Sequence, residues 1–174
     1  HKFNFVQKVD MLQYAKPGGT FLLNSPYGPD EIWEKLPHPV QAAILNKKLH
    51  FYVIDASKVA EEVDMGNRIN TIMQVCFFAV SGVLPRDEAI AEIKASIVKT
   101  YGKKGDEIVA MNLQAVDRTL ENLHEVRVPL TVSSHVQFIP PVTADAPPFV
   151  KHVIGEMIAR RGDNLPVSAM PVDG

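Results

Sequence analysis

Two short apolar runs, each followed by helix-forming residues, constrain the fold of this chain more than any other feature. Residues 20–23 form the first run, and a proline with two acidic residues opens a helix soon after it. The second run, residues 49–54 (LHFYVI), is β-branched and aromatic, ends at Asp55 and leads directly into a helical pattern at 56–63. A succession of strand, helix, strand and helix at this spacing predicts an α/β fold with a parallel sheet.

Three longer segments downstream show the apolar periodicity of helices. The first is apolar on most sides, so we expect it to be central, with Asn67 as its N-cap. Shorter helices are expected beside the two strands. Together these segments predict a three-layer α/β/α (Rossmann-like) partial domain. The helices are expected at residues 6–15, 29–36, 39–46, 56–63, 68–83, 86–100 and 106–124.

Proline becomes frequent from about residue 126 and changes the character of the chain. Its spacing is too dense for regular elements, and one helix at 149–160 interrupts it. We therefore divide the chain into a domain at 1–125, which we expect to lack its N-terminal part, and an extended proline-rich connector at 126–174. Because the chain lacks an initial methionine and ends within proline-rich sequence, we expect it to be a segment of a longer protein.

Composition argues against several classes of function. A net charge of −2 gives no reason to expect binding to nucleic acid or to a membrane surface. The single cysteine, Cys76, leaves no set of thiolates for an iron–sulfur cluster or a structural zinc, and it fits a reducing, cytoplasmic location. Its apolar neighbours indicate a buried structural thiol. The six histidines lack metal-binding spacing, so we expect no metal site.

Few polar residues stand where a binding site would form. Gly18 and Gly19 precede their strand, whereas the glycines of a phosphate-binding loop follow one, so this pair predicts a turn. Asn24 and Ser25 end the first strand, at the edge where open α/β sheets bind ligands. The turn YGKKG at 101–105 offers its two lysines either to phosphate or to solvent.

Two asparagines could have either a structural role or a role in binding a ligand. Asn70 lies in the first turn of an otherwise apolar helix, where free N–H groups and the positive end of the helix dipole attract polar ligands. Asn112 borders the apolar stripe of the last long helix, where packing does not need an amide. On sequence physics alone, a cap or a surface amide is the simpler interpretation of each.

Three long stretches of the chain resemble one enzyme family. They are FNFVQKVDMLQYAKPGGTFLLNSPYGPDEIWEKLP, FYVIDASKVAEEVDMGNRINTIMQVCFFAVSGVLPRDEAI and YGKKGDEIVAMNLQAVDRTLENLHEV. They closely resemble the pyruvate:ferredoxin (flavodoxin) oxidoreductases, in the domain equivalent to the gamma subunit of the multi-subunit 2-oxoacid:ferredoxin oxidoreductases. The ending DNLPVSAMPVDG resembles the passage that precedes the family's ferredoxin-like iron–sulfur domain. The resemblance covers essentially the whole chain.

The resemblance implies a reaction shared among several domains. Thiamine diphosphate, held with Mg²⁺, attacks pyruvate and CO₂ leaves. Electrons pass through [4Fe–4S] clusters to ferredoxin or flavodoxin, and coenzyme A takes the acetyl group. The ligands of these cofactors are expected in other domains of a homodimeric parent enzyme, so the chain alone is expected to be inactive.

The same resemblance assigns this domain a part of the coenzyme A site. Two family asparagines match the sequence, namely Asn70 in GNRINTIMQ and Asn112 in VAMNLQAVD. The family's glycine-rich turn and a lysine that help to bind coenzyme A would lie upstream of His1.

Two alternative hypotheses accompany this interpretation. The same family could act on another 2-oxo acid, or the chain could be a free-standing, non-catalytic α/β interaction module. Thiamine and cluster motifs beside these residues in the parent reading frame would favour an enzyme, and stop codons would favour the module.

Overall fold

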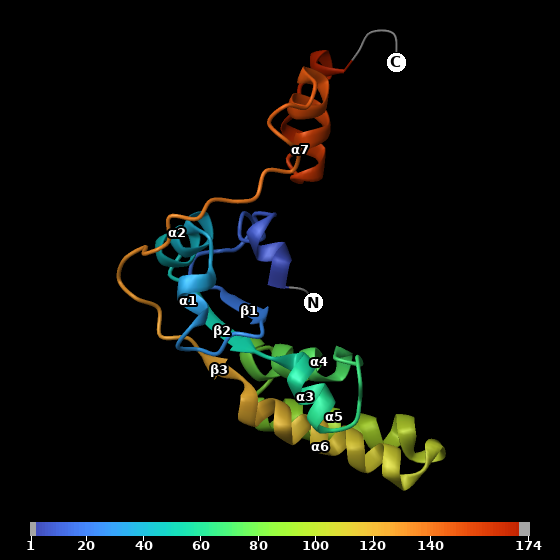
Figure 1. Ribbon diagram of the computed structural model, residues 1–174. Helices are drawn as coiled ribbons and strands as arrows, with labels where there is room; N and C mark the ends of the chain where they lie inside the picture. Colours follow the sequence, from blue (N-terminus) through green and yellow to red (C-terminus); the bar gives the residue numbers. More distant parts are fainter. Residues whose placement is uncertain (1–2, 171–174) are drawn as a thin grey trace.

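The two predicted strands form a parallel pair at the centre of the chain (Figure 1). The computed structural model describes residues 3–170, so the last four residues of the predicted connector lie outside the described part. Strand β1 (Thr20–Asn24) pairs in parallel with β2 (His50–Ile54). A third strand, β3 (His124–Glu125), pairs with β2 in the antiparallel sense and was not expected from the sequence. The parallel pairing that the sequence predicted is confirmed.

Helices connect and follow these strands close to the expected positions. The first two join β1 to β2, α3 begins directly after β2, and the next three form a separate layer. A π-helical turn at Val150–Ile154 continues into the last helix. The α-helices are α1 (Ile32–Lys35), α2 (His38–Asn46), α3 (Ala56–Glu62), α4 (Asn70–Ser81), α5 (Arg86–Tyr101), α6 (Asp106–Asn122) and α7 (Gly155–Ile158). Short 3₁₀ turns lie at Phe3–Gln7, Gly102–Lys104, Gly162–Asn164 and Val167–Ala169.

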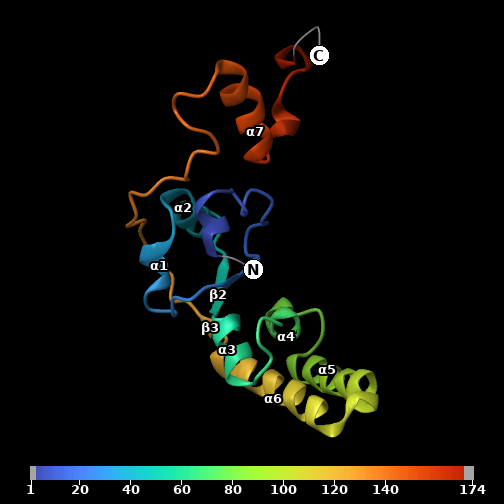
Figure 2. The same cartoon turned by 45° about the vertical axis from the view of Figure 1, so that its right-hand side comes forward.

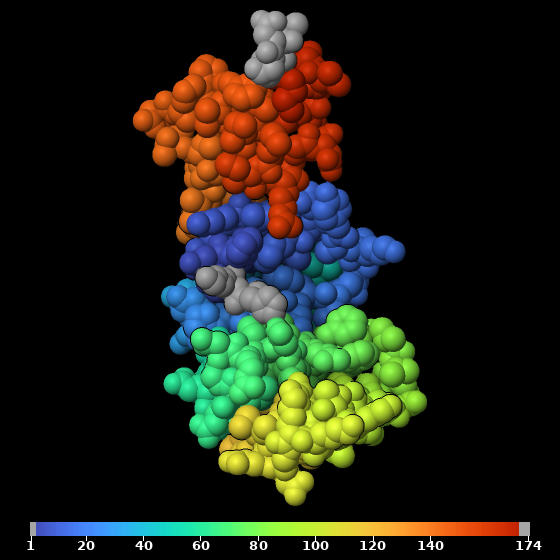
Figure 3. Space-filling model, turned by 90° about the vertical axis from the view of Figure 1, so that its right-hand side faces the viewer, coloured from blue at the N-terminus to red at the C-terminus, as the bar shows by residue number. Residues whose placement is uncertain are grey.

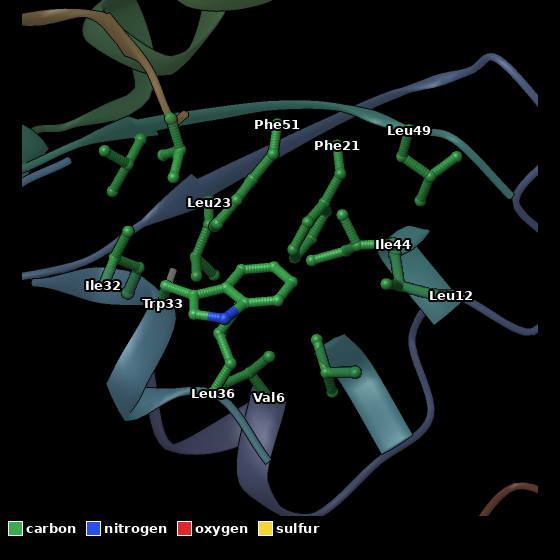
Figure 4. Packing of buried hydrophobic residues seen from close by; sticks show 13 residues of the cluster. Val6, Leu12, Phe21, Leu23, Ile32, Trp33, Leu36, Ile44, Leu49 and Phe51 are labelled. Carbon is green, nitrogen blue, oxygen red and sulfur yellow. The ribbon is translucent and has the colours of Figure 1, made fainter. Parts of the chain in front are cut away.

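Both faces of the sheet are covered, because successive side chains of a strand point to opposite sides. On one face, Phe21 and Phe51 stack with ring centroids 5.1 Å apart, and they pack in one cluster with Trp33 of α1 (Figure 4). On the other face, Ile54 packs in a cluster with residues of α3, α4 and α6. This arrangement agrees with the predicted three layers of a partial α/β domain.

Helices α4, α5 and α6 pack on one another at one end of the molecule (Figure 2). Their shared cluster contains Val75, Ile93, Ile97 and Val116. Helix α4 packs against α3, α5, α6 and β1, so the expectation that it is central is confirmed, although its Phe77 is 52% exposed. The helix begins two residues later than expected, and the residue before it, Ile69, makes no side-chain cap bond. The prediction of an N-cap by Asn67 is therefore wrong.

The helix expected at 6–15 is not formed. A 3₁₀ turn and irregular turns occupy this segment, and Asp10 Oδ1 accepts the Leu12 N–H at 3.1 Å. Lys47 Nζ donates to the carbonyl groups of Leu12 and Gln13. The spacing of apolar residues here reflects separate buried contacts, such as those of Val6 and Leu12, rather than one helical face.

The proline-rich part leaves β3, runs along α1 and α2, and reaches a small helical unit at the far end of the molecule (Figures 1 and 3). Val126 is buried in the cluster that contains Phe51, while Val153 and Ala159 are buried within the helical unit. None of the helices in residues 3–170 is long and apolar enough to span a membrane.

Candidate functional site

Asn70 is the first residue of α4, and it is exposed. The first N–H groups of a helix have no partner within the helix, and the helix dipole places partial positive charge there. An exposed carboxamide beside these groups can donate to and accept from a ligand. The structure thus leaves Asn70 accessible, as a binding role requires.

Asn112 lies in the middle of α6 on its buried face and is 5% exposed. Its Nδ2 donates to the carbonyl oxygen of Ile108, one helical turn earlier, at 2.8 Å. Its neighbours on this face include Ala115, Val116 and Thr119. The sequence placed Asn112 at the border of the apolar stripe, and the structure places it inside the packed face.

The two asparagines lie on helices that pack against each other, but their environments differ. Ile72 and Cys76 of α4 share a buried cluster with Ala115 of α6. In the described part of the chain, no hydrogen bond joins the side chains of Asn70 and Asn112. A ligand could contact the exposed Asn70 directly. The side chain of Asn112 offers little accessible surface to a ligand, because the residue is only 5% exposed.

A hollow of about 440 Å³ lies between α4 and α5. Its lining begins at Thr71, the residue after Asn70, and it combines hydroxyl groups with apolar side chains. The polar lining includes Gln74, the carboxylate of Glu92, Ser96 and Thr100, and the apolar lining includes Phe78 and Tyr101. Sequence analysis did not indicate this hollow, because its lining comes from two helices and the short segment between them, and how these pack cannot be inferred from either helix alone.

The carboxyl edge of the parallel strands carries a second hollow, of about 600 Å³. Asn24 Oδ1 accepts the Ala56 N–H at 2.9 Å, and Asp55 Oδ1 accepts the Lys58 N–H at 3.0 Å. The Ser25 hydroxyl accepts the Tyr27 N–H at 3.0 Å. Asn24 and Asp55 join the strand ends to the start of α3, Ser25 holds the turn after β1, and each of the three contacts has a structural role at the predicted edge.

Cys76 is fully buried in α4, and burial raises the pKa of its thiol to about 12. The thiol is therefore neutral at physiological pH and is a poor nucleophile and metal ligand. The prediction of a buried structural thiol is confirmed. In residues 3–170, no group of three or more His, Cys, Asp or Glu side chains is placed to hold a metal ion.

The burial of Cys76 makes its modification dependent on unfolding. In native buffer at about pH 8, we expect the chain to react with a disulfide reagent at least about a thousandfold more slowly than in urea, because reaction requires global or large local opening. The measurement is the rate at which the reagent releases its coloured thiolate on reaction with Cys76. Equal rates in buffer and in urea would contradict the burial of this thiol.

Comparisons with known proteins identify the family. A family model described as pyruvate ferredoxin/flavodoxin oxidoreductase matches residues 4–122, and a second model, described as a domain of unknown function, matches residues 137–174. A putative pyruvate-flavodoxin oxidoreductase of Synechocystis is 55% identical to the chain, in an alignment that covers all of the chain and 15% of the relative. The pyruvate-flavodoxin oxidoreductase of Rhodospirillum rubrum is 54% identical to the chain, and the alignment covers all of the chain and 14% of the relative.

A ferredoxin-linked relative gives the same result. The pyruvate:ferredoxin oxidoreductase of Moorella thermoacetica is 46% identical to the chain, and the alignment covers all of the chain and 15% of the relative. The chain thus spans about 15% of the length of these relatives. It belongs to the pyruvate ferredoxin/flavodoxin oxidoreductase family.

Proposed function

We propose that this chain is part of an enzyme that oxidatively decarboxylates pyruvate to acetyl-coenzyme A and CO₂ and passes the electrons to ferredoxin or flavodoxin. Family membership and the names of the similar proteins support this activity for the parent protein. The chain's own contribution is to bind coenzyme A and to join neighbouring domains. The observation that carries the binding role is the exposed Asn70 at the start of α4.

The chemistry around Asn70 suits a ligand such as coenzyme A. The first turn of α4 offers N–H groups and a positive dipole end, which favour phosphate and carbonyl oxygens. The hollow that begins at Thr71 presents both hydroxyl and apolar side chains. Such a lining fits an elongated ligand in which amide groups alternate with methylene groups. In this proposal, Asn70 contacts coenzyme A and Asn112 supports the site from the adjacent α6.

In our proposal, the cofactors that the resemblance implies are held by other parts of the parent protein. A [4Fe–4S] cluster is held by several thiolates, and the chain has one cysteine, whose thiol is buried and neutral. We assign no residue of the chain to thiamine diphosphate or to Mg²⁺. These groups belong to the remainder of the parent protein in our proposal, which leaves this chain as a part of the enzyme without catalytic residues of its own.

Substitution of the two asparagines tests the coenzyme A role. In the full-length enzyme, Asn70→Ala and Asn112→Ala are expected to raise the KM for coenzyme A several-fold, since a lost hydrogen bond costs about 1 kcal/mol. Formation of the bound intermediate from pyruvate, with its first electron transfer, should be unchanged. The measurements are steady-state kinetics with varied coenzyme A, and single-turnover reduction in its absence.

A structural role would give a different pattern. If the asparagines only stabilise their helices, as the hydrogen bond from Asn112 to Ile108 does, the variants would lose about 1 kcal/mol of stability and melt earlier, while keeping the parental dependence on coenzyme A. Asn67→Ala serves as a control, because Asn67 is exposed and lies three residues before Asn70 but outside the helix. If Asn67→Ala raised the KM as much as Asn70→Ala, the contact would not be specific to Asn70.

A further inference from the structure

A buried glutamine side chain binds the proline-rich segment to the α/β unit. Gln41 of α2 is 0% exposed. Its Oε1 accepts the N–H groups of both Ser133 and Ser134 at 2.9 Å, and its Nε2 donates to the Trp33 carbonyl oxygen at 2.6 Å. Nε2 also lies 3.4 Å from the Ser133 hydroxyl. We call residues 126–139 the strap, and Gln41 is its central attachment.

Two further side chains of the same helical layer hold the middle of the strap. The backbone N–H of His38 donates to the Val136 carbonyl oxygen at 2.7 Å, and the His38 ring Nδ1 lies 3.0 Å from the Ser134 carbonyl oxygen. Because a carbonyl oxygen can only accept, this contact requires a proton on Nδ1. The Ser133 hydroxyl donates to Glu34 Oε1 at 2.8 Å.

Backbone hydrogen bonds fix the strap at both ends. The Val126 N–H donates to the Phe51 carbonyl oxygen at 2.8 Å, and the Ile139 N–H donates to the Gln7 carbonyl oxygen, also at 2.8 Å. Val128 and Phe138 pack against the core cluster of the α/β unit. The strap is therefore attached at both ends and at residues 133–136, while Leu130 between these points is 96% exposed.

The Gln41 carboxamide selects one register of the strap. Without this side chain, the N–H groups of Ser133 and Ser134 would lose their acceptor, and the loss is most costly at Ser134, which is buried. If the strap slipped by one residue, Oε1 would no longer face both N–H groups. An apolar residue would satisfy the packing of α2 equally well. The buried amide is therefore explained by its hydrogen bonds to Ser133 and Ser134 of the strap.

The chain becomes weakly attached just beyond the strap. Pro140 and Pro141 have no N–H group to donate, and the helical turns that follow contact chiefly one another. Two hollows of about 520 Å³ each lie between this helical unit and residues 4–14. Met157 and Ile158 of the unit remain exposed beside them.

We propose that Gln41 makes the strap a fixed part of the α/β unit, so that the C-terminal helical unit pivots at Pro140–Pro141 and not at residue 126, where the proline-rich sequence begins. The two family models leave residues 123–136 unmatched between them, and most of the strap lies in this interval. In this proposal, the parts of the chain that match the two family models, residues 4–122 and 137–174, are joined by a segment that is bound to the α/β unit and not by a flexible linker.

Hydrogen exchange in the full-length protein tests this proposal. The strap amides that donate hydrogen bonds to the α/β unit, those of Val126, Ser133, Ser134 and Ile139, should exchange as slowly as the amides of β2. In Gln41→Met, which keeps the volume and loses the amide, exchange of the strap should increase by at least about tenfold, while β2 should be unchanged. Trypsin should then cleave after Arg127 faster than in the parental protein, because cleavage of the strap requires its release.

Matched variants decide the outcome. Gln114→Met removes an exposed glutamine from α6 and should leave the exchange of the strap unchanged. If Gln41→Met folds and the strap keeps its parental exchange, the proposal is overturned. If Gln41→Met does not fold, Ser133→Pro removes one of the two N–H donors without altering α2. Parental exchange of the strap in Ser133→Pro would overturn the proposal equally.

Discussion

Replacement of Phe51 by alanine is expected to lower the free energy of unfolding of the chain by about 3–5 kcal/mol, because it removes a large buried ring and leaves a cavity. Phe51 is 1% exposed, and its ring stacks on Phe21 in the core on one side of the sheet. Its carbonyl oxygen accepts the first hydrogen bond of the strap from Val126. A loss of this size is a large share of the stability of a small domain. Urea unfolding followed by circular dichroism measures it.

An exposed phenylalanine provides the matched control. Phe77 of α4 is about half exposed, so Phe77→Ala should cost less than about 1 kcal/mol. Phe51→Leu keeps most of the buried volume and should fall between the two. Equal costs for Phe51→Ala and Phe77→Ala would show that the core is not where the structure places it.

The sheet and most of the helices could be predicted because their signals are local. The run LHFYVI contains the β-branched and aromatic residues of a buried strand, and β2 forms within it at His50–Ile54. The stripe of α6 repeats at helical spacing, and the helix ends within two residues of the expected position. Periodicity over many residues outweighs the weak preference of any one of them.

The features that were missed depend on contacts between distant residues. Gln41 and Ser133 lie 92 positions apart, and nothing in the sequence near either residue indicates the other. Strand β3 is two residues long, too short for an alternating pattern. The segment at 6–15 has helical spacing, but its hydrogen bonds are made to Asp10 and Lys47. Tertiary contacts overrode local preference in each case.

The candidate site divides in the same way. Sequence reasoning correctly placed Asn70 in the first turn of a helix, because an apolar segment followed it. The sequence could not tell that Asn112 is buried, since the face that α6 presents depends on how α4 and α5 pack against it. The small neighbours Ala115 and Thr119 on the same face are the one local sign of close packing there.

The difference in burial between the two asparagines leads to opposite expectations for the same substitution. Asn70→Asp places a carboxylate in the first turn of α4, where the helix dipole stabilises negative charge by about 0.3–1 kcal/mol. Asn112→Asp places a carboxylate in a packed face, opposite the Ile108 carbonyl oxygen, to which the amide now donates. An ionised carboxylate cannot donate, and an unpaired buried charge costs about 3–5 kcal/mol.

The pH dependence separates this electrostatic loss from a loss of packing. Burial favours the neutral acid, so the pKa of the introduced aspartic acid in the folded chain should lie above its unfolded value of about 3.9. The folded state then binds more protons than the unfolded state, and stability falls as pH rises through the raised pKa. Asn112→Asp should therefore approach the parental melting temperature near pH 4 and melt well below it at pH 8, while Asn70→Asp should show no such fall. Melting curves at several pH values measure both variants, and a loss at Asn112→Asp that is equal at pH 4 and pH 8 would mean that the cost comes from shape and not from buried charge.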